Sequence, residues 1–159
     1  MLKSFLFYFG TGLLTPYFLS LLVKGNVSIV LSVVAVAIGF VSLYIGKLAD
    51  KVGVKKLFFI SVPISILAAF FLHYFATQIV YGISIAVIGL LIDIETSNRS
   101  ESSGKKFGRL SFYIQMASAF SLALGGVVSG FQATIIYAGL LTIFLLLTIR
   151  KNNLLIDKA

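Results

Sequence analysis

Four long runs without a charged residue constrain the fold of this chain more than any other feature. They cover residues 4–23, 25–46, 57–92 and 110–149, and they contain 20, 22, 36 and 40 residues. A helix rises about 1.5 Å per residue and the hydrocarbon core of a bilayer is about 30 Å thick, so one crossing takes about 20 residues. The first two runs therefore predict one transmembrane helix each, and the last two predict two each.

This count predicts an all-α membrane protein with six transmembrane helices in one domain over residues 1–159. The hydrophobic share of 59% lies above the usual soluble range of about 45–50%, and the runs lack the sustained alternation of a membrane β-barrel. Turns are predicted at 73–78 and 130–132, where polar residues or glycine interrupt the two longest runs. The predicted helices cover residues 4–23, 26–46, 56–73, 78–94, 107–130 and 132–150.

The positions of lysine and arginine predict the orientation of these helices. Six spans place both termini on one side of the membrane, and of the 13 lysines and arginines only Lys24 falls on the other side. Because such an excess marks the cytoplasmic side, we expect a multi-pass protein of the cell membrane with both termini in the cytoplasm. The basic residues are divided among short loops rather than gathered in one stripe, so nucleic-acid binding is not expected.

Few side chains in the sequence are suited to catalysis or metal binding. The chain has no cysteine, and its one histidine, His73, has no second histidine or deep carboxylate to join it. Asp93, Glu95, Arg99 and Arg109 are predicted to form a cytoplasmic charge cluster, but the acidic residues lack the spacing of metal ligands. We therefore expect neither an enzyme nor a metal or cofactor site.

Two predicted helix faces carry polar side chains through apolar segments. Tyr8, Thr11 and Thr15 recur at helical spacing and share one face of the first helix. Gln115 and Ser118 belong to a stripe of small and polar residues on the fifth helix. Such residues serve helix packing more often than ligand binding, but a glutamine in hydrocarbon needs partners that a water-filled cavity could supply. Helix packing and a substrate cavity are therefore both open interpretations of these residues.

The segment GKLADKVGVKK, residues 46–56, gathers four lysines and Asp50 in an otherwise oily chain. By span count it is the cytoplasmic loop between the second and third helices. Gly46 is expected to end the second helix, and Gly53 to permit a left-handed turn into the third. The lysines suit contact with anionic head groups. Asp50 suits a specific partner, either a lysine or the N-terminal amides of a facing helix.

This loop closely resembles the signature loop between helices 2 and 3 of major facilitator superfamily transporters. The shared pattern is Gly46-x-Leu48-Ala49-Asp50-Lys51-x-Gly53-x-Lys55-Lys56, at the matching place in the topology. The stretches GTGLLTPYF, LIDIETSNR with FGRL, and LALGGVVSGF are similar to the first, fourth and fifth helices of that family, so the resemblance covers nearly the whole chain. It implies a gating loop formed by Gly46, Asp50, Lys51, Gly53, Lys55 and Lys56.

The family is normally built from two six-helix halves, and this chain resembles one half of the N-terminal type. The resemblance therefore implies transport of a small solute by alternating access, by a parallel homodimer or together with a separate second half. The strong charge bias favours parallel pairing. The alternative is a non-transporting half-transporter that acts as an assembly or interaction partner in the membrane. The expected partners are the lipid bilayer, a small-molecule solute, and a second copy or second half.

Overall fold

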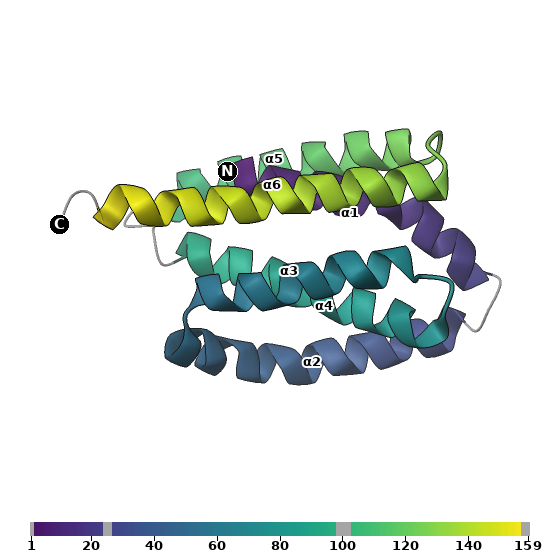
Figure 1. The fold of residues 1–159 in the computed structure, drawn as a ribbon, viewed down its shortest axis with the longest axis horizontal. Coiled ribbons are helices and arrows are strands. Elements are labelled where there is room, and N and C mark those ends of the chain that lie inside the picture. Colours follow the sequence, from purple (N-terminus) through teal and green to yellow (C-terminus); the bar gives the residue numbers. More distant parts are fainter. Residues whose placement is uncertain (1, 24–26, 98–102, 157–159) are drawn as a thin grey trace.

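The computed structural model describes residues 2–23, 27–97 and 103–156, and these residues form six α-helices, as the sequence predicts. Successive helices run in opposite directions, so the start of α1 and the end of α6 lie at the same end of the bundle (Figure 1). The helices are α1 (Leu2–Val23), α2 (Val27–Val52), α3 (Val54–Phe70), α4 (Phe75–Ser97), α5 (Ser103–Gly125) and α6 (Gly130–Ile156).

Four helices in the described part of the chain are long and apolar enough to cross a membrane, which is two fewer than predicted. The other two are α3 and α5. α3 has 17 residues and carries two lysines in its first turn, and α5 begins with a basic segment. The 17 residues of α3 span about 25 Å, slightly less than the hydrocarbon core, whereas α5 has 23 residues and differs from a candidate span in its composition. Spanning by α3 and α5 therefore stays a prediction. The candidate spans are Leu2–Leu22, Ile29–Val52, Phe75–Ser97 and Gly130–Ile149.

The six helices form two groups of three (Figure 1). α1 packs against α5 and α6, and α4 packs against α2 and α3. The main contact between the groups is made by α3 and α6. There the rings of Phe58 and Phe144 lie 5.1 Å apart, and the buried hydroxyl groups of Ser65 and Tyr137 are hydrogen-bonded. A core of aromatic side chains therefore joins the two groups.

Small residues bring α1 and α5 together. A Cβ atom added to Gly125 would lie 2.5 Å from the carbonyl oxygen of Leu13, and one added to Gly12 would lie 1.9 Å from Oγ of Ser121. Neither glycine can carry a side chain without displacing its neighbour. This close approach supports the packing interpretation of the small-residue stripe on the fifth helix.

The α3–α4 and α5–α6 turns, at the end of the bundle opposite the start of α1, lie a few residues from their predicted places. The α3–α4 turn occupies residues 71–74, and Gln78 lies inside α4, where its Nε2 donates a hydrogen bond to the carbonyl oxygen of Leu72 at 2.9 Å. The α5–α6 turn occupies residues 126–129. Ser129 and Gln132 then form a reciprocal capping box, with N–H to side-chain oxygen distances of 3.3 and 3.4 Å, which starts α6 earlier than predicted.

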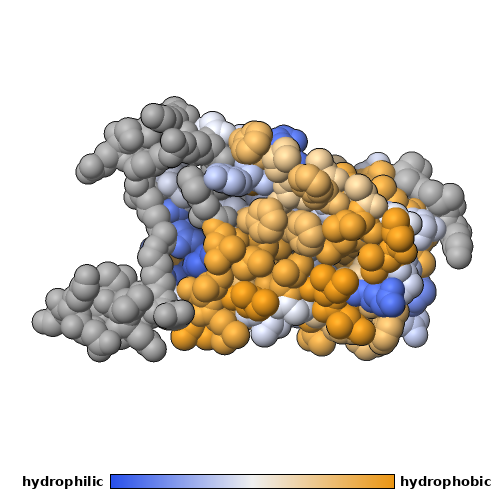
Figure 2. Space-filling view, turned by 90° about the horizontal axis from the view of Figure 1, so that it is seen from above, coloured by the Kyte–Doolittle hydropathy of each residue, from blue (hydrophilic) through white to orange (hydrophobic). Residues whose placement is uncertain are grey.

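The outer surface of the bundle is broadly apolar. Figure 2 shows hydrophobic side chains over its middle, with hydrophilic ones toward its ends. On α2, for example, Phe40 and Leu43 are 64% and 69% exposed. Apolar side chains exposed on helices of spanning length suit contact with acyl chains.

Candidate functional site

The predicted loop at residues 46–56 is a sharp corner between two helices. α2 continues to Val52 and α3 begins at Val54, so Gly53 alone separates them. Gly53 has φ 89° and is the one residue with positive φ in the described part of the chain. Its N–H still donates to the carbonyl oxygen of Ala49 at 2.9 Å. The prediction that Gly53 turns the chain is borne out by its positive φ, although its ψ of 136° lies outside the left-handed helical region. The prediction of an eleven-residue loop, 46–56, is wrong.

Gly46 does not end α2, contrary to expectation. It lies inside the helix, and a Cβ atom there would meet nothing within 4 Å, so no other helix of the described chain packs closely against it. The helix continues because Ile45 and Ala49, one turn apart, are both buried in the core. A glycine inside a helix costs only about 0.5–1 kcal/mol, which is too little to end a helix that is stabilised by such packing.

The charged residues of the corner lie mostly at its surface. Asp50 and Lys51 are exposed on the last turn of α2, Lys56 is exposed on the first turn of α3, and Lys55 is half-buried. Within the described residues, no hydrogen bond or ion pair reaches Asp50. Its carboxylate is therefore accessible to a further element at this end of the bundle.

Gly53→Ala is expected to destabilise the protein by about 1–3 kcal/mol, because a non-glycine residue is strained at this φ and ψ. The side chain itself has room, since a Cβ atom at Gly53 would meet nothing within 4 Å. Gly46→Ala is a matched control in the same segment, and it should be neutral or stabilising by about 0.5–1 kcal/mol. Thermal unfolding of the purified variants in detergent measures both effects. Equal melting temperatures for the two variants would contradict the role of Gly53.

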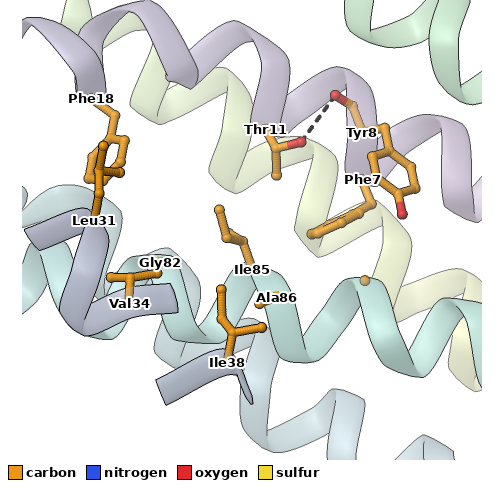
Figure 3. Close-up of a pocket in the computed structure, with 11 residues that line it drawn as sticks. Phe7, Tyr8, Thr11, Phe18, Leu31, Val34, Ile38, Gly82, Ile85 and Ala86 are labelled. Carbon is orange, nitrogen blue, oxygen red and sulfur yellow. Dashed lines mark hydrogen bonds between the residues drawn. The ribbon is translucent and has the colours of Figure 1, made fainter. Parts of the chain in front are cut away.

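A cavity of about 410 Å³ lies between α1, α2 and α4 (Figure 3). Its lining positions 7–18 and 82–89 lie near the middle of α1 and α4. Gly82 allows α2 to approach α4 closely, because a Cβ atom there would lie 2.9 Å from Val34. The lining residues are Phe7, Tyr8, Thr11, Phe18, Leu31, Val34, Ile38, Gly82, Ile85, Ala86 and Gly89.

The lining of this cavity is almost entirely apolar, and none of the described residues that line it is charged. The hydroxyl group of Thr11 donates to the carbonyl oxygen of Tyr8 at 3.1 Å, so its proton is used inside the helix. The phenol oxygen of Tyr8 lies beside Gly89, 3.8 Å from where a Cβ atom would stand. A ligand would therefore be held mainly by aliphatic and aromatic surface, with Tyr8 and Thr11 as the polar residues of the lining.

Two of the five predicted cavity residues, Tyr8 and Thr11, line this cavity, while Thr15, Gln115 and Ser118 do not. The hydroxyl group of Thr15 donates to the carbonyl oxygen of Thr11 at 2.7 Å. Gln115 is exposed on α5. The carbonyl oxygen of Ser118 lies 3.4 Å from the Cβ position of Gly12, which places Ser118 in the α1–α5 contact. The aliphatic and aromatic lining residues were not predicted, because the sequence offers no signal that separates them from other apolar helix positions.

The predicted charge cluster is described only in part. Glu95 lies 3.5 Å from Nζ of Lys3, and this ion pair connects α4 to α1. The same ammonium group lies 5.8 Å from the ring centroid of Phe144 on α6. Asp93 is exposed. Arg99 lies outside the described residues, and so does the side chain of Arg109.

Besides the Lys3–Glu95 ion pair, another polar contact joins the two helix groups nearer to the C-terminal end of α1. The hydroxyl group of Tyr17 lies 3.0 Å from Nε2 of His73 in the α3–α4 turn, which confirms the predicted place of His73 in a turn. The Lys3–Glu95 and Tyr17–His73 contacts therefore connect α1 to the α3–α4 hairpin on either side of the cavity. The sequence did not reveal either pair, because the partners are far apart along the chain.

No protein-family model, curated protein or solved structure matches this chain. The described residues form an all-helical protein of six helices, four of which are long and apolar enough to span a membrane. These features indicate a multi-pass membrane protein in contact with the lipid bilayer.

Proposed function

We propose that the chain transports a small solute across the membrane by alternating access, as one half of a transporter of the major facilitator type. The cavity of about 410 Å³ near the middle of α1 and α4 is the observation that carries this proposal. Secondary transporters bind their substrates near the bilayer midplane, and ligand cavities commonly enclose about 300–1,000 Å³. The corner at Asp50 and Gly53, which resembles the gating loop of that family, adds support.

The chemistry of the cavity favours a neutral or amphipathic solute. Among the described residues no charged side chain lines the cavity, and the hydroxyl proton of Thr11 is already used by the backbone. A fully charged solute would lose its hydration there without gaining an ionic partner, which is unfavourable in an apolar environment. An aromatic or aliphatic solute would instead pack against Phe7, Phe18 and Ile85, with one polar group directed at Tyr8.

We propose further that two copies pair in parallel, or that a separate second half completes the transporter. Three helices border the cavity, and it stays partly open to its surroundings. A second half would close it. The alternative, a non-transporting assembly partner, draws support from the two contacts on either side of the cavity, Lys3–Glu95 and Tyr17–His73, which favour a fixed arrangement of the chain.

Labelling of a single cysteine tests alternating access without knowledge of the substrate. The chain has no cysteine of its own, so Thr11→Cys places the only thiol in the cavity. We expect membrane-impermeant thiol reagents to label it from both sides of sealed vesicles, because each side of the membrane reaches the cavity in one of the two conformations. Gly139→Cys, on the exposed face of α6, is the control and should stay unlabelled in lipid.

The side from which Thr11→Cys is labelled distinguishes the two functions. Labelling from both sides, reduced by neutral amphipathic solutes smaller than the cavity, would favour transport. Labelling from one side alone, or from neither side while Lys51→Cys reacts normally, would contradict alternating access and favour the assembly-partner alternative.

We also propose that α3 and α5 cross the membrane, which gives six spans with both termini in the cytoplasm. α3 packs along α4 and α5 packs along α1, and both partners are candidate spans. Reporter fusions after Tyr74 and Val128 should then be external, and fusions after Gly53, Ser102 and Lys158 internal. A four-span protein in which α3 and α5 do not cross would reverse the results at Tyr74 and Ser102. These two fusions therefore decide the number of spans.

A further inference from the structure

A second cavity, of about 310 Å³, forms an apolar groove between α2, α3 and α4. It shares no lining residue with the cavity described above. Its walls are aliphatic, apart from Ser61 and Ser84. The hydroxyl groups of these serines donate to the carbonyl oxygens of Leu57 and Tyr81, both at 2.9 Å, so their protons are used within their own helices. The groove therefore suits hydrocarbon rather than a polar solute.

The groove opens on the outer surface of the bundle. Leu48, Ile60 and Ile64 line it and are 43%, 57% and 43% exposed. The part of α3 between Leu57 and Ile64 is about 10 Å long at the helical rise. Because α2 and α4 are candidate spans, an open groove between them faces acyl chains.

Lysines lie at the end of this groove that is nearest to the α2–α3 corner. Lys51 follows Leu48 by three residues and Lys56 precedes Ile60 by four, so each lies one turn nearer the corner on the same helix face as a groove residue. Both lysines are exposed. The neighbouring acidic side chain, Asp50, leaves residues 46–56, with four lysines, at a net charge of +3.

We propose that the groove and these lysines form a binding site for an anionic phospholipid. One acyl chain lies along the aliphatic walls, and the phosphate group meets Lys51 and Lys56 at the surface of the leaflet. The groove alone would take the chain of any phospholipid, so the lysines supply the selectivity for an anionic head group. This inference depends on membrane insertion and holds whether or not the chain transports a solute.

Native mass spectrometry of the purified protein, with equal amounts of phosphatidylglycerol and phosphatidylethanolamine in mixed micelles, tests this site. Two lysines near a head group should favour phosphatidylglycerol by about 30-fold. The double variant Lys51→Gln/Lys56→Gln should bring the ratio of retained lipids close to one. Lys24→Gln, which removes a lysine outside this segment, should leave the ratio unchanged. Equal retention of both lipids by the wild type, or an unchanged preference in the double variant, would overturn the proposal.

Two further experiments distinguish binding through the acyl chain from binding through the phosphate group. Ser84→Leu fills the groove with hydrocarbon and should reduce the retention of both lipids several-fold. Val87→Phe, in the same α4 wall of the groove, should act in the same way and replaces Ser84→Leu if that variant does not fold. Soluble glycerol phosphate should not displace the lipid. Undiminished retention in the folded groove variant, or displacement by glycerol phosphate, would show that the groove does not hold the chain.

Discussion

Gly125→Leu is expected to destabilise the pairing of α1 and α5 by more than 3 kcal/mol, and Gly125→Ala by about 1–3 kcal/mol. The first added carbon atom would lie 2.5 Å from the carbonyl oxygen of Leu13. That oxygen belongs to the backbone of α1 and cannot rotate away, so the whole helix must move. Thermal unfolding in detergent, followed by circular dichroism, measures both losses. Gly139→Ala is the control, because a Cβ atom there would meet nothing within 4 Å.

A compensating substitution distinguishes this packing from a general intolerance of helix changes. A Cβ atom at Gly12 would lie 1.9 Å from Oγ and 3.0 Å from Cβ of Ser121. Ser121→Gly removes both atoms, so it should recover much of the stability lost in Gly12→Ala. In a double-mutant cycle the two changes should therefore be strongly non-additive. Additive effects would contradict a direct contact between α1 and α5 at this point.

The sequence was sufficient for the number of helices and for the residue that turns the corner between α2 and α3. The lengths of the charge-free runs predicted six helices, and six are present, although only four in the described part of the chain are long and apolar enough to span a membrane. Gly53 could be assigned because only glycine adopts such a backbone conformation without strain. The small residues around Gly125 were also suited to a close helix contact, although the sequence does not identify α1 as the partner.

The helix ends were less predictable, because hydrophobicity marks the membrane core rather than the end of a helix. α2 continues past Gly46 through a charged segment, since Ile45 and Ala49 are buried on one face. At the start of α6 a usable signal was present: Ser129 and Gln132 have the spacing of a capping box.

The cavity could be anticipated only through its polar residues. Tyr8 and Thr11 were predicted from their shared helix face, and both line it. Its remaining walls are apolar side chains such as Ile38 and Ile85, which are indistinguishable in sequence from residues that face lipid. The contacts on either side of the cavity depend on side chains brought together by the tertiary fold, which no local pattern encodes.

Asp50→Asn is expected to change the ratio of inside to outside labelling of Thr11→Cys by about tenfold to hundredfold. A contact shifts a conformational equilibrium only if it is stronger in one state than in the other. Asp50 is exposed and has no ion-pair or hydrogen-bond partner within the described residues. If the corner gates, its carboxylate gains a partner in the other conformation or from a second half. A charge-assisted hydrogen bond contributes about 1.5–3 kcal/mol, which corresponds to this range of population ratios.

Asparagine keeps the shape of Asp50 and removes its charge, so expression and membrane insertion should stay close to those of the wild type. Asp50→Glu is the matched control, because it keeps the charge and should retain most of the original labelling ratio. Lys51→Ala should have a smaller effect than Asp50→Asn, since Lys47, Lys55 and Lys56 preserve the positive charge of the segment. If Asp50→Asn and the wild type are labelled in the same ratio, the corner does not gate. The resemblance of residues 46–56 to a gating loop would then reflect ancestry alone, and the assembly-partner alternative would gain support.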